Sequence, residues 1–166
     1  MMRQHLCRMA RYNRWANRQL IKTCSMLSEA DYFAEGKMFF GSIHGTFNHI
    51  LVADRLWLTR ILGEPPPRLK LDDRPFADLP ALRHARDEQD LVMIDLIESY
   101  VDSDLDADIS YRMVTLPEDV TTPLHLCWLH LFNHQTHHRG QIHDQLMQTS
   151  VTPPPLDLIY YLREHR

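Results

Sequence analysis

Residues 41–67 read GSIHGTFNHILVADRLWLTRILGEPPP and mark the start and the end of one long helix. The helix is predicted to start at Ser42, just after a glycine, and to continue to about Leu62. Gly63 and the three prolines that follow stop it, because glycine favours the backbone conformation at a helix end and proline cannot continue a helix. This helix is the reference from which the rest of the chain can be read.

Two further segments carry apolar residues at helical intervals, one on each side of this helix. The first runs from about Gln4 to Ser25 and the second from about Ala81 to Val101. Ser28, with an acid three residues later, satisfies a capping box for a short helix between the first of these segments and the helix that starts at Ser42. The stretch from Glu64 to Leu79 is rich in proline and aperiodic, so it is predicted to be a crossover loop.

The pattern changes between residues 102 and 121, where Ile109, Tyr111, Met113 and Thr115 alternate with polar neighbours. This period of two is typical of a short extended hairpin. Thr122 and Pro123 are then expected to be the N-cap and first residue of the last long helix, which continues to about Gln148.

Four long amphipathic helices with one long crossover loop predict an all-α, four-helix-bundle fold. At 166 residues, the chain has the length of one domain, covering residues 1–166. A short segment that follows Pro153–Pro155 should pack on the bundle.

The composition argues against several classes of protein. The formal charge is −4 and the arginines are scattered, which disfavours a nucleic-acid partner. The chain lacks a signal-peptide pattern and an apolar stretch long enough to span a membrane. Its three cysteines have no C-x-x-C spacing, so reduced thiols in a cytoplasmic, soluble protein are expected.

The last helix carries a cluster of histidines, in residues 130–143. His134 and His138 lie four residues apart, on one helix face, and can converge on one metal ion. The same spacing relates His130 to His134. His137 points about 100° away from His138 around the helix, so the two cannot both face inward.

A third ligand must come from another helix, and His49 is the best candidate, because it lies among apolar residues of the helix that starts at Ser42. His44 faces a different direction. The free ring nitrogen of each ligand needs a hydrogen-bond partner, for which Asn133, Gln141 and Asp144 are open alternatives.

Four other residues near the histidines leave alternatives open. Gln135 occupies the position at which metalloproteases carry a general-base glutamate, so that class is disfavoured. Gly140 indicates either the close approach of a backbone or ligand, or tight helix packing. Cys127 either faces the metal cavity or is a small buried hydrophobe. Arg139 is expected to be solvated, or else to neutralise a carboxylate on a bound thiol.

Three segments together resemble the DinB/YfiT-like family of metalloenzymes: ARYNRWANRQL at residues 10–20, GSIHGTFNHILVADRLWL at 41–58 and HLFNHQTHHRGQI at 130–142. The resemblance implies an up-down-down-up four-helix bundle, frequently homodimeric. It also implies one divalent metal ion per chain, nickel or zinc, held by His49, His134 and His138. His137, Gln141 and His130 are expected to surround the ligands without being clear ligands themselves.

Relatives of known activity use the metal to activate a low-molecular-weight thiol such as bacillithiol or mycothiol. The resemblance therefore implies a metal-dependent thiol S-transferase that acts on an electrophilic small molecule. A metal-dependent hydrolase and a non-catalytic, stress-response metal-binding protein are the alternatives. The number of protein ligands distinguishes an enzyme from a non-catalytic protein, because a structural zinc site usually has four protein ligands. A homodimer would use apolar surface such as that around Trp15, Trp57 and Tyr160.

Overall fold

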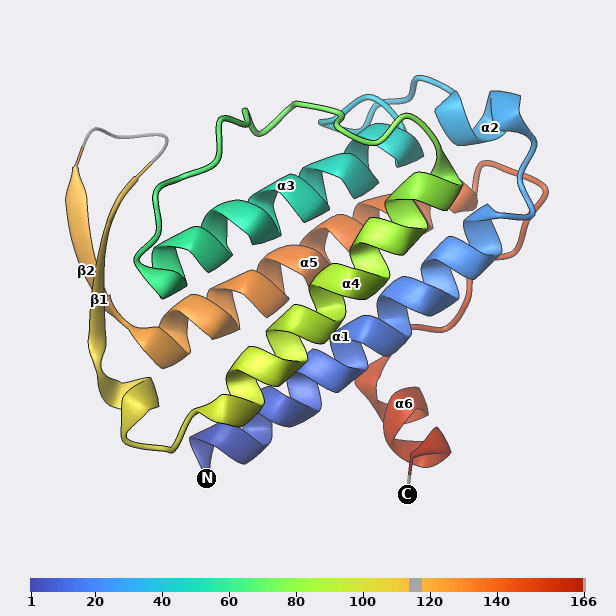
Figure 1. Ribbon diagram of the computed structural model, residues 1–166. Coiled ribbons are helices and arrows are strands. Elements are labelled where there is room, and N and C mark those ends of the chain that lie inside the picture. Colours follow the sequence, from blue (N-terminus) through green and yellow to red (C-terminus); the bar gives the residue numbers. More distant parts are fainter. Residues whose placement is uncertain (114–117, 166) are drawn as a thin grey trace.

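The computed structural model describes residues 1–113 and 118–165, and the fold is mostly helical (Figure 1). The long helices are α1 (Met2–Cys24), α3 (Ile43–Leu62), α4 (Leu79–Ser99) and α5 (Leu124–Leu146). The short elements are α2 (Glu29–Phe33), the 3-10 helix η1 (Asp104–Asp106), β1 (Asp108–Arg112), β2 (Asp119–Pro123) and α6 (Leu158–Glu164). The small sheet departs from a purely all-α class.

The four long helices pack side by side, with α1 against α4 and α5, and α3 against α5 and α4. In Figure 1, α1 and α5 run in one direction while α3 and α4 run in the other. Because α3 and α4 share a direction, the chain between them has to return along the length of the molecule. Residues 63–78 make this return over the outer face of α3.

The predicted ends of α3 and the predicted cap of α2 are confirmed. The hydroxyl of Ser42 accepts a hydrogen bond from the backbone N–H of Gly45 at 3.1 Å. Gly63 closes the helix in the left-handed conformation, at φ 67°, which glycine adopts without steric cost. The hydroxyl of Ser28 accepts a hydrogen bond from the backbone N–H of Asp31 at 3.0 Å.

Two predicted helix starts are wrong. Helix α4 begins at Leu79 and not at Ala81, because the Asp78 carboxylate caps it by accepting the Ala81 N–H at 2.8 Å. Proline is tolerated in the first turn of a helix, where its missing N–H is not needed, so Pro80 does not delay the start.

Helix α5 begins at Leu124, because Thr122 and Pro123 belong to β2, where they pair with Ile109 and Asp108 of β1. Proline fits here because β2 is an edge strand of a two-stranded sheet, where a missing N–H is tolerated. The predicted alternation is confirmed for Ile109 and Tyr111, which point their half-buried side chains to one face. Thr115 lies outside the described residues.

The core consists of two large apolar clusters, with buried polar residues between them, and a small third cluster of Tyr12, Ala16 and Tyr161. One cluster surrounds Trp128 and includes Leu6, Met93 and Leu131, whereas the other surrounds Ile50 and includes Leu20, Leu82 and Ile142. At intermediate positions along the same helices lie seven polar side chains of at most 2% exposure: Asn13, Asn17, Asp54, Arg86, Asp90, Gln135 and Arg139. We call this set the polar layer.

The C-terminal segment packs on the bundle as predicted. The ring of Tyr161 in α6 lies 6.0 Å from Tyr12 and 5.9 Å from Trp15, measured between ring centroids. All three cysteines are buried and carry free thiols. Within the described ranges, no helix combines the length and the apolar character that crossing a bilayer requires.

Candidate metal centre

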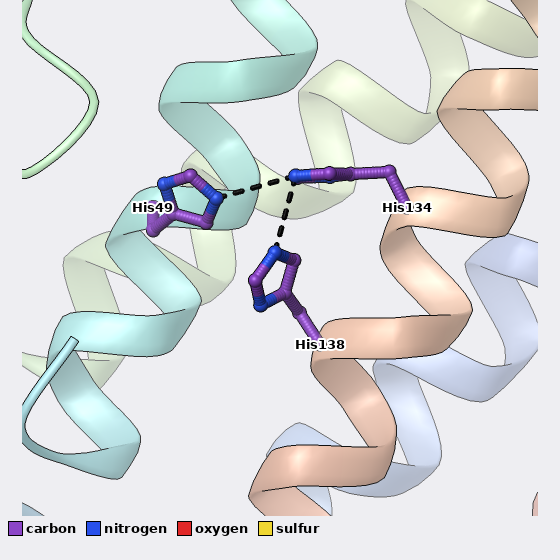
Figure 2. A group of neighbouring side chains, drawn as sticks. All are labelled: His49, His134 and His138. Carbon is purple, nitrogen blue, oxygen red and sulfur yellow. Dashed lines mark hydrogen bonds between the residues drawn. The ribbon is translucent and has the colours of Figure 1, made fainter. Parts of the chain in front are cut away.

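Three histidines from two helices meet at one point beside the polar layer (Figure 2). The Nε2 atom of His134 lies 3.3 Å from Nε2 of His49 and 3.1 Å from Nε2 of His138. Each residue offers a ring nitrogen within 4.8 Å of the other two. The structure therefore brings together the three side chains that the sequence predicted as ligands.

Hydrogen bonds to the far ring nitrogens set the orientation of two of these imidazoles. Nδ1 of His49 donates to the backbone carbonyl of Leu71 at 2.8 Å, and Nδ1 of His138 donates to the side-chain oxygen of Gln141 at 2.8 Å. A neutral imidazole that donates through Nδ1 has an unprotonated Nε2. Both Nε2 lone pairs therefore point toward His134.

The three Nε2 atoms fit a divalent cation. Ligand nitrogens at Zn–N distances of about 2.0–2.1 Å in a tetrahedron are separated by about 3.3 Å. The Nε2 separations on either side of His134, 3.1 Å and 3.3 Å, match that spacing. Neutral imidazole is also the form that binds a metal, and its orientation through the second ring nitrogen is the usual arrangement in metal sites.

Burial keeps the three imidazoles neutral. It lowers the pKa of His49 to about 4, an effect that the Leu71 carbonyl partly opposes. Burial, followed by the proximity of His138 and His49, lowers the pKa of His134 to about 3. Burial lowers the pKa of His138 as well, although the bond to Gln141 opposes it. No proton has to be removed from these rings at neutral pH before a cation binds.

Phe40 closes one side of the histidine group. Its ring stacks on His49 with centroids 3.6 Å apart and an interplanar angle of 15°, and it meets His138 edge-on at 5.6 Å. The sequence analysis missed this residue, which lies in the irregular segment between α2 and α3. The only available signal was a pair of phenylalanines outside any predicted helix, directly before Gly41.

The other predicted neighbours are placed differently from one another. Gln141 contacts His138, whereas exposed His137 hydrogen-bonds to the amide of Gln141 at 3.3 Å and meets the His138 ring edge-on at 4.8 Å. His130 lies one turn away, with its ring centroid 6.0 Å from that of His134. His44 faces away from the group, as predicted, and its Nδ1 lies 3.1 Å from the Tyr32 hydroxyl. Of the three alternatives for a ring-nitrogen partner, Gln141 is therefore the one in contact.

The prediction for Gly140 is wrong in part, and that for Arg139 is wrong. Gly140 is exposed, and a Cβ atom added to it would have no neighbour within 4 Å among the described residues, so neither close approach of this chain's backbone nor tight helix packing explains it. Arg139 is only 2% exposed and is held in the polar layer by Asn17 at 3.1 Å and by Thr136 at 3.1 Å. It is neither solvated nor free to meet a ligand.

The polar layer fixes the rotation of α5. Gln135 donates to Asp54 of α3 at 2.7 Å and accepts from Asn17 of α1 at 3.0 Å. Because Gln135 and Arg139 each directly follow a histidine of the group, their burial turns His134 and His138 toward α3. A signal existed in the sequence: polar pairs four residues apart recur on otherwise apolar faces, at 13 and 17, 86 and 90, and 135 and 139.

A cavity of about 530 Å³ opens beside the histidines, between α3, α5 and the hairpin. His49 and His134 form one end of it, and Cys127, Trp57 and Tyr111 line its walls. Cys127 thus faces the cavity, and burial raises the pKa of its thiol, which makes it an inert wall group.

An acid titration of the metal-free protein tests the burial of this site. We expect midpoints of about pH 4 for His49 and about pH 3 for His134, measured from the imidazole resonances by NMR. A lowered pKa means that the folded protein resists protonation, so its stability is fully present above the unfolded-state value of about 6.5. Stability is lost as the pH falls toward the folded-state values. Midpoints near 6.5 for both rings would mean that water reaches the site freely.

Comparison with known proteins places the chain beside a protein family, a curated relative and a solved structure. A family model described as the DinB family matches residues 2–166. Protein DinB of Bacillus subtilis (strain 168) is 25% identical over 156 residues, which cover 91% of this chain and 90% of that protein. The crystal structure of a DinB-like protein from Bacillus cereus ATCC 10987 has a TM-score of 0.65 at 18% identity, and the match covers 84% of this chain and 89% of that one.

Proposed function

Because the chain belongs to the DinB family, we propose that it binds one divalent metal ion, nickel or zinc, through His49, His134 and His138 and acts as a metal-dependent thiol S-transferase. One observation carries the proposal: ring nitrogens of three histidines lie within 4.8 Å of one another, and two of these histidines, His49 and His134, line a cavity. That arrangement offers a metal together with room for a reacting molecule.

The number of protein ligands favours a reactive site over a structural one. Structural zinc sites usually have four protein ligands, and catalytic sites have three and an open position. In the part of the chain that the structure describes, no fourth histidine, cysteine or acidic residue joins the group. His130 and Cys127 line the same cavity but are not members of the group.

The bound ion would act as a Lewis acid that stabilises a thiolate at neutral pH, because a borderline-soft cation with neutral ligands favours an anionic sulfur. The chain's own residues hold the imidazoles neutral, orient two of them and surround the reacting sulfur with apolar walls. The thiol would lose its proton to solvent. The sulfur would then form a bond to an electrophilic carbon beside it, as a leaving group departs with the electron pair.

Cobalt substitution tests this function directly. Addition of cysteine or mercaptoethanol to the cobalt-loaded protein should produce a sulfur-to-metal charge-transfer band and release about one proton per thiol bound. The His138→Ala variant, which lacks a ligand, should give neither signal. If millimolar thiols leave both the spectrum and the proton balance of the unaltered protein unchanged, the transferase proposal fails. Metal-dependent hydrolysis or a non-catalytic role would then take its place.

Two finer features are proposed with this function. We propose that the long helices form the up-down-down-up bundle of the family, which the directions visible in Figure 1 support. We also propose a homodimer, on the family resemblance alone. Light scattering at micromolar concentration should give twice the 19.6 kDa of one chain. A mass equal to that of one chain would contradict the dimer.

A further inference from the structure

We propose that the cavity beside the histidines binds an elongated, largely apolar molecule that ends in a carboxylate, and that Arg60 receives this carboxylate. The inference rests on the proposed function for the identity of the reacting end, which would lie at the histidines. The proposed carboxylate site depends only on the residues around Arg60, at the end of the cavity away from the histidines, and not on the metal or the reaction.

The cavity follows the groove between two antiparallel helices. On α3, the lining residues His49, Ala53, Trp57 and Arg60 recur at intervals of three or four and so share one face. On α5, the order is reversed, because His134 lies beside His49 while the ring of His130 is 4.7 Å from that of Trp57. Arg60 lies eleven positions after His49 on α3, which corresponds to about 16 Å along the helix.

Arg60 lies at the end of the cavity far from the histidines. Its guanidinium is 4.6 Å from the Trp57 ring centroid and 5.1 Å from that of Tyr111, and these two rings contact each other edge-to-face, so the cation rests against an aromatic pair. One of its N–H groups donates to the Arg112 carbonyl at 3.3 Å. A guanidinium has five such donors, so most of them are left for a ligand.

No carboxylate of the described residues lies within ion-pair distance of Arg60, and none lines the cavity. Arg60 is the one lining side chain among these residues that is charged at all pH values of interest. Partial burial removes water from the guanidinium and lowers its pKa without neutralising it. An anion brought to this position would therefore gain more than it would at an exposed arginine.

The walls between the two ends are apolar. Leu56, Leu71, Met113 and Leu126 contribute to them, and the cavity volume of about 530 Å³ is in the range of sites for small organic molecules. A free inorganic anion would leave these walls uncovered. A single guanidinium carries one positive charge, which balances a carboxylate fully but a phosphate monoester, with a charge of about −1.5 to −2, only in part. The carboxylate could belong to the electrophile or to the thiol.

The test begins with metal-free protein, so that it does not depend on the proposed reaction. Calorimetry should show that 6-phenylhexanoate binds about 10- to 100-fold more tightly than 6-phenylhexanamide, the range for a hydrogen bond to a charged group. Arg60→Gln should abolish this preference. Arg8→Gln, which removes an exposed arginine of α1, should retain it.

Equal binding of the acid and the amide by the unaltered protein would overturn the inference, even if Arg60→Gln failed to fold. An unchanged preference in folded Arg60→Gln would overturn it too. A preference that depends on Arg60, found in a protein whose metal-loaded form ignores thiols, would keep the inference and reject the transferase proposal. Thiol binding by the metal-loaded protein, without a preference of the metal-free protein for the acid over the amide, would keep the transferase proposal and reject the inference.

A second arm identifies the source of the carboxylate with zinc-loaded protein. If the thiol carries it, 8-mercaptooctanoate should bind at least tenfold more tightly than 8-mercaptooctanol, and Arg60→Gln should remove the difference. If the electrophile carries it, the two thiols should bind alike and 6-phenylhexanoate should bind together with mercaptoethanol. Either result places a carboxylate at Arg60. If neither result is obtained, the inference is overturned.

Discussion

Replacing His134 by alanine is expected to reduce the divalent metal content from close to one ion per chain to almost none. His134 is the central member of the group, since its Nε2 atom lies within 3.3 Å of both other Nε2 atoms. Loss of a partner that merely orients a ligand costs about 10- to 100-fold in metal affinity, so loss of a ligand should cost more than 100-fold. Elemental analysis of protein purified without a nickel column gives the measurement.

His130→Ala is the matched control for this experiment. His130 lies on the same helix, one turn earlier, and lines the same cavity without belonging to the group. It should keep its metal, as should His84→Ala on the exposed face of α4. Gln141→Leu should weaken binding by the intermediate factor of about 10–100, because Gln141 only orients His138. Equal metal content in the His130 and His134 variants would refute the proposed ligand set.

Replacing Arg86 by methionine is expected to destabilise the protein by about 3–5 kcal/mol, the usual cost of leaving a buried charge unpaired. Arg86 is 2% exposed and forms an ion pair with Asp54 of α3. It also forms an ion pair with Asp90 at 3.0 Å. Urea denaturation gives the free energy of unfolding. Arg83→Met, on the exposed side of the same helix, should change it by less than about 0.5 kcal/mol.

The pH dependence shows whether the cost comes from charge or from packing. Burial raises the pKa of Asp54 to about 6 even beside Arg86, and it also raises the pKa of Asp90. Without Arg86 both pKa values should rise further. An aspartate whose pKa is raised in the folded protein favours folding at a pH below the pKa of the unfolded state. This contribution is lost as the pH increases through the pKa of the folded state. The variant should therefore lose most at pH 7.5 and less at pH 5, whereas a packing defect would be independent of pH.

His134 and His138 lie four residues apart on one helix, and His49 lies among apolar residues. These two features identified the three converging histidines before the fold was known. Helix ends were predictable where a local signal was strong, as at Ser42 and Gly63. They were wrong at Ala81 and Thr122, where side-chain capping and strand pairing competed with the local pattern. Spacing along a helix determines which side chains share a face, and this information is local.

Only the tertiary structure decided what surrounds the histidines. The Leu71 carbonyl that orients His49 comes from a loop 22 residues away, and Phe40 stacks on His49 from an irregular segment. Periodicity does not encode the path of such loops. The arginines illustrate the same point, because Arg139, expected to be solvated, is buried in the polar layer, while Arg60, which no sequence pattern singled out, faces the cavity. Which polar face of a helix becomes buried depends on complementary charges from other helices, and these meet only when all the helices pack together.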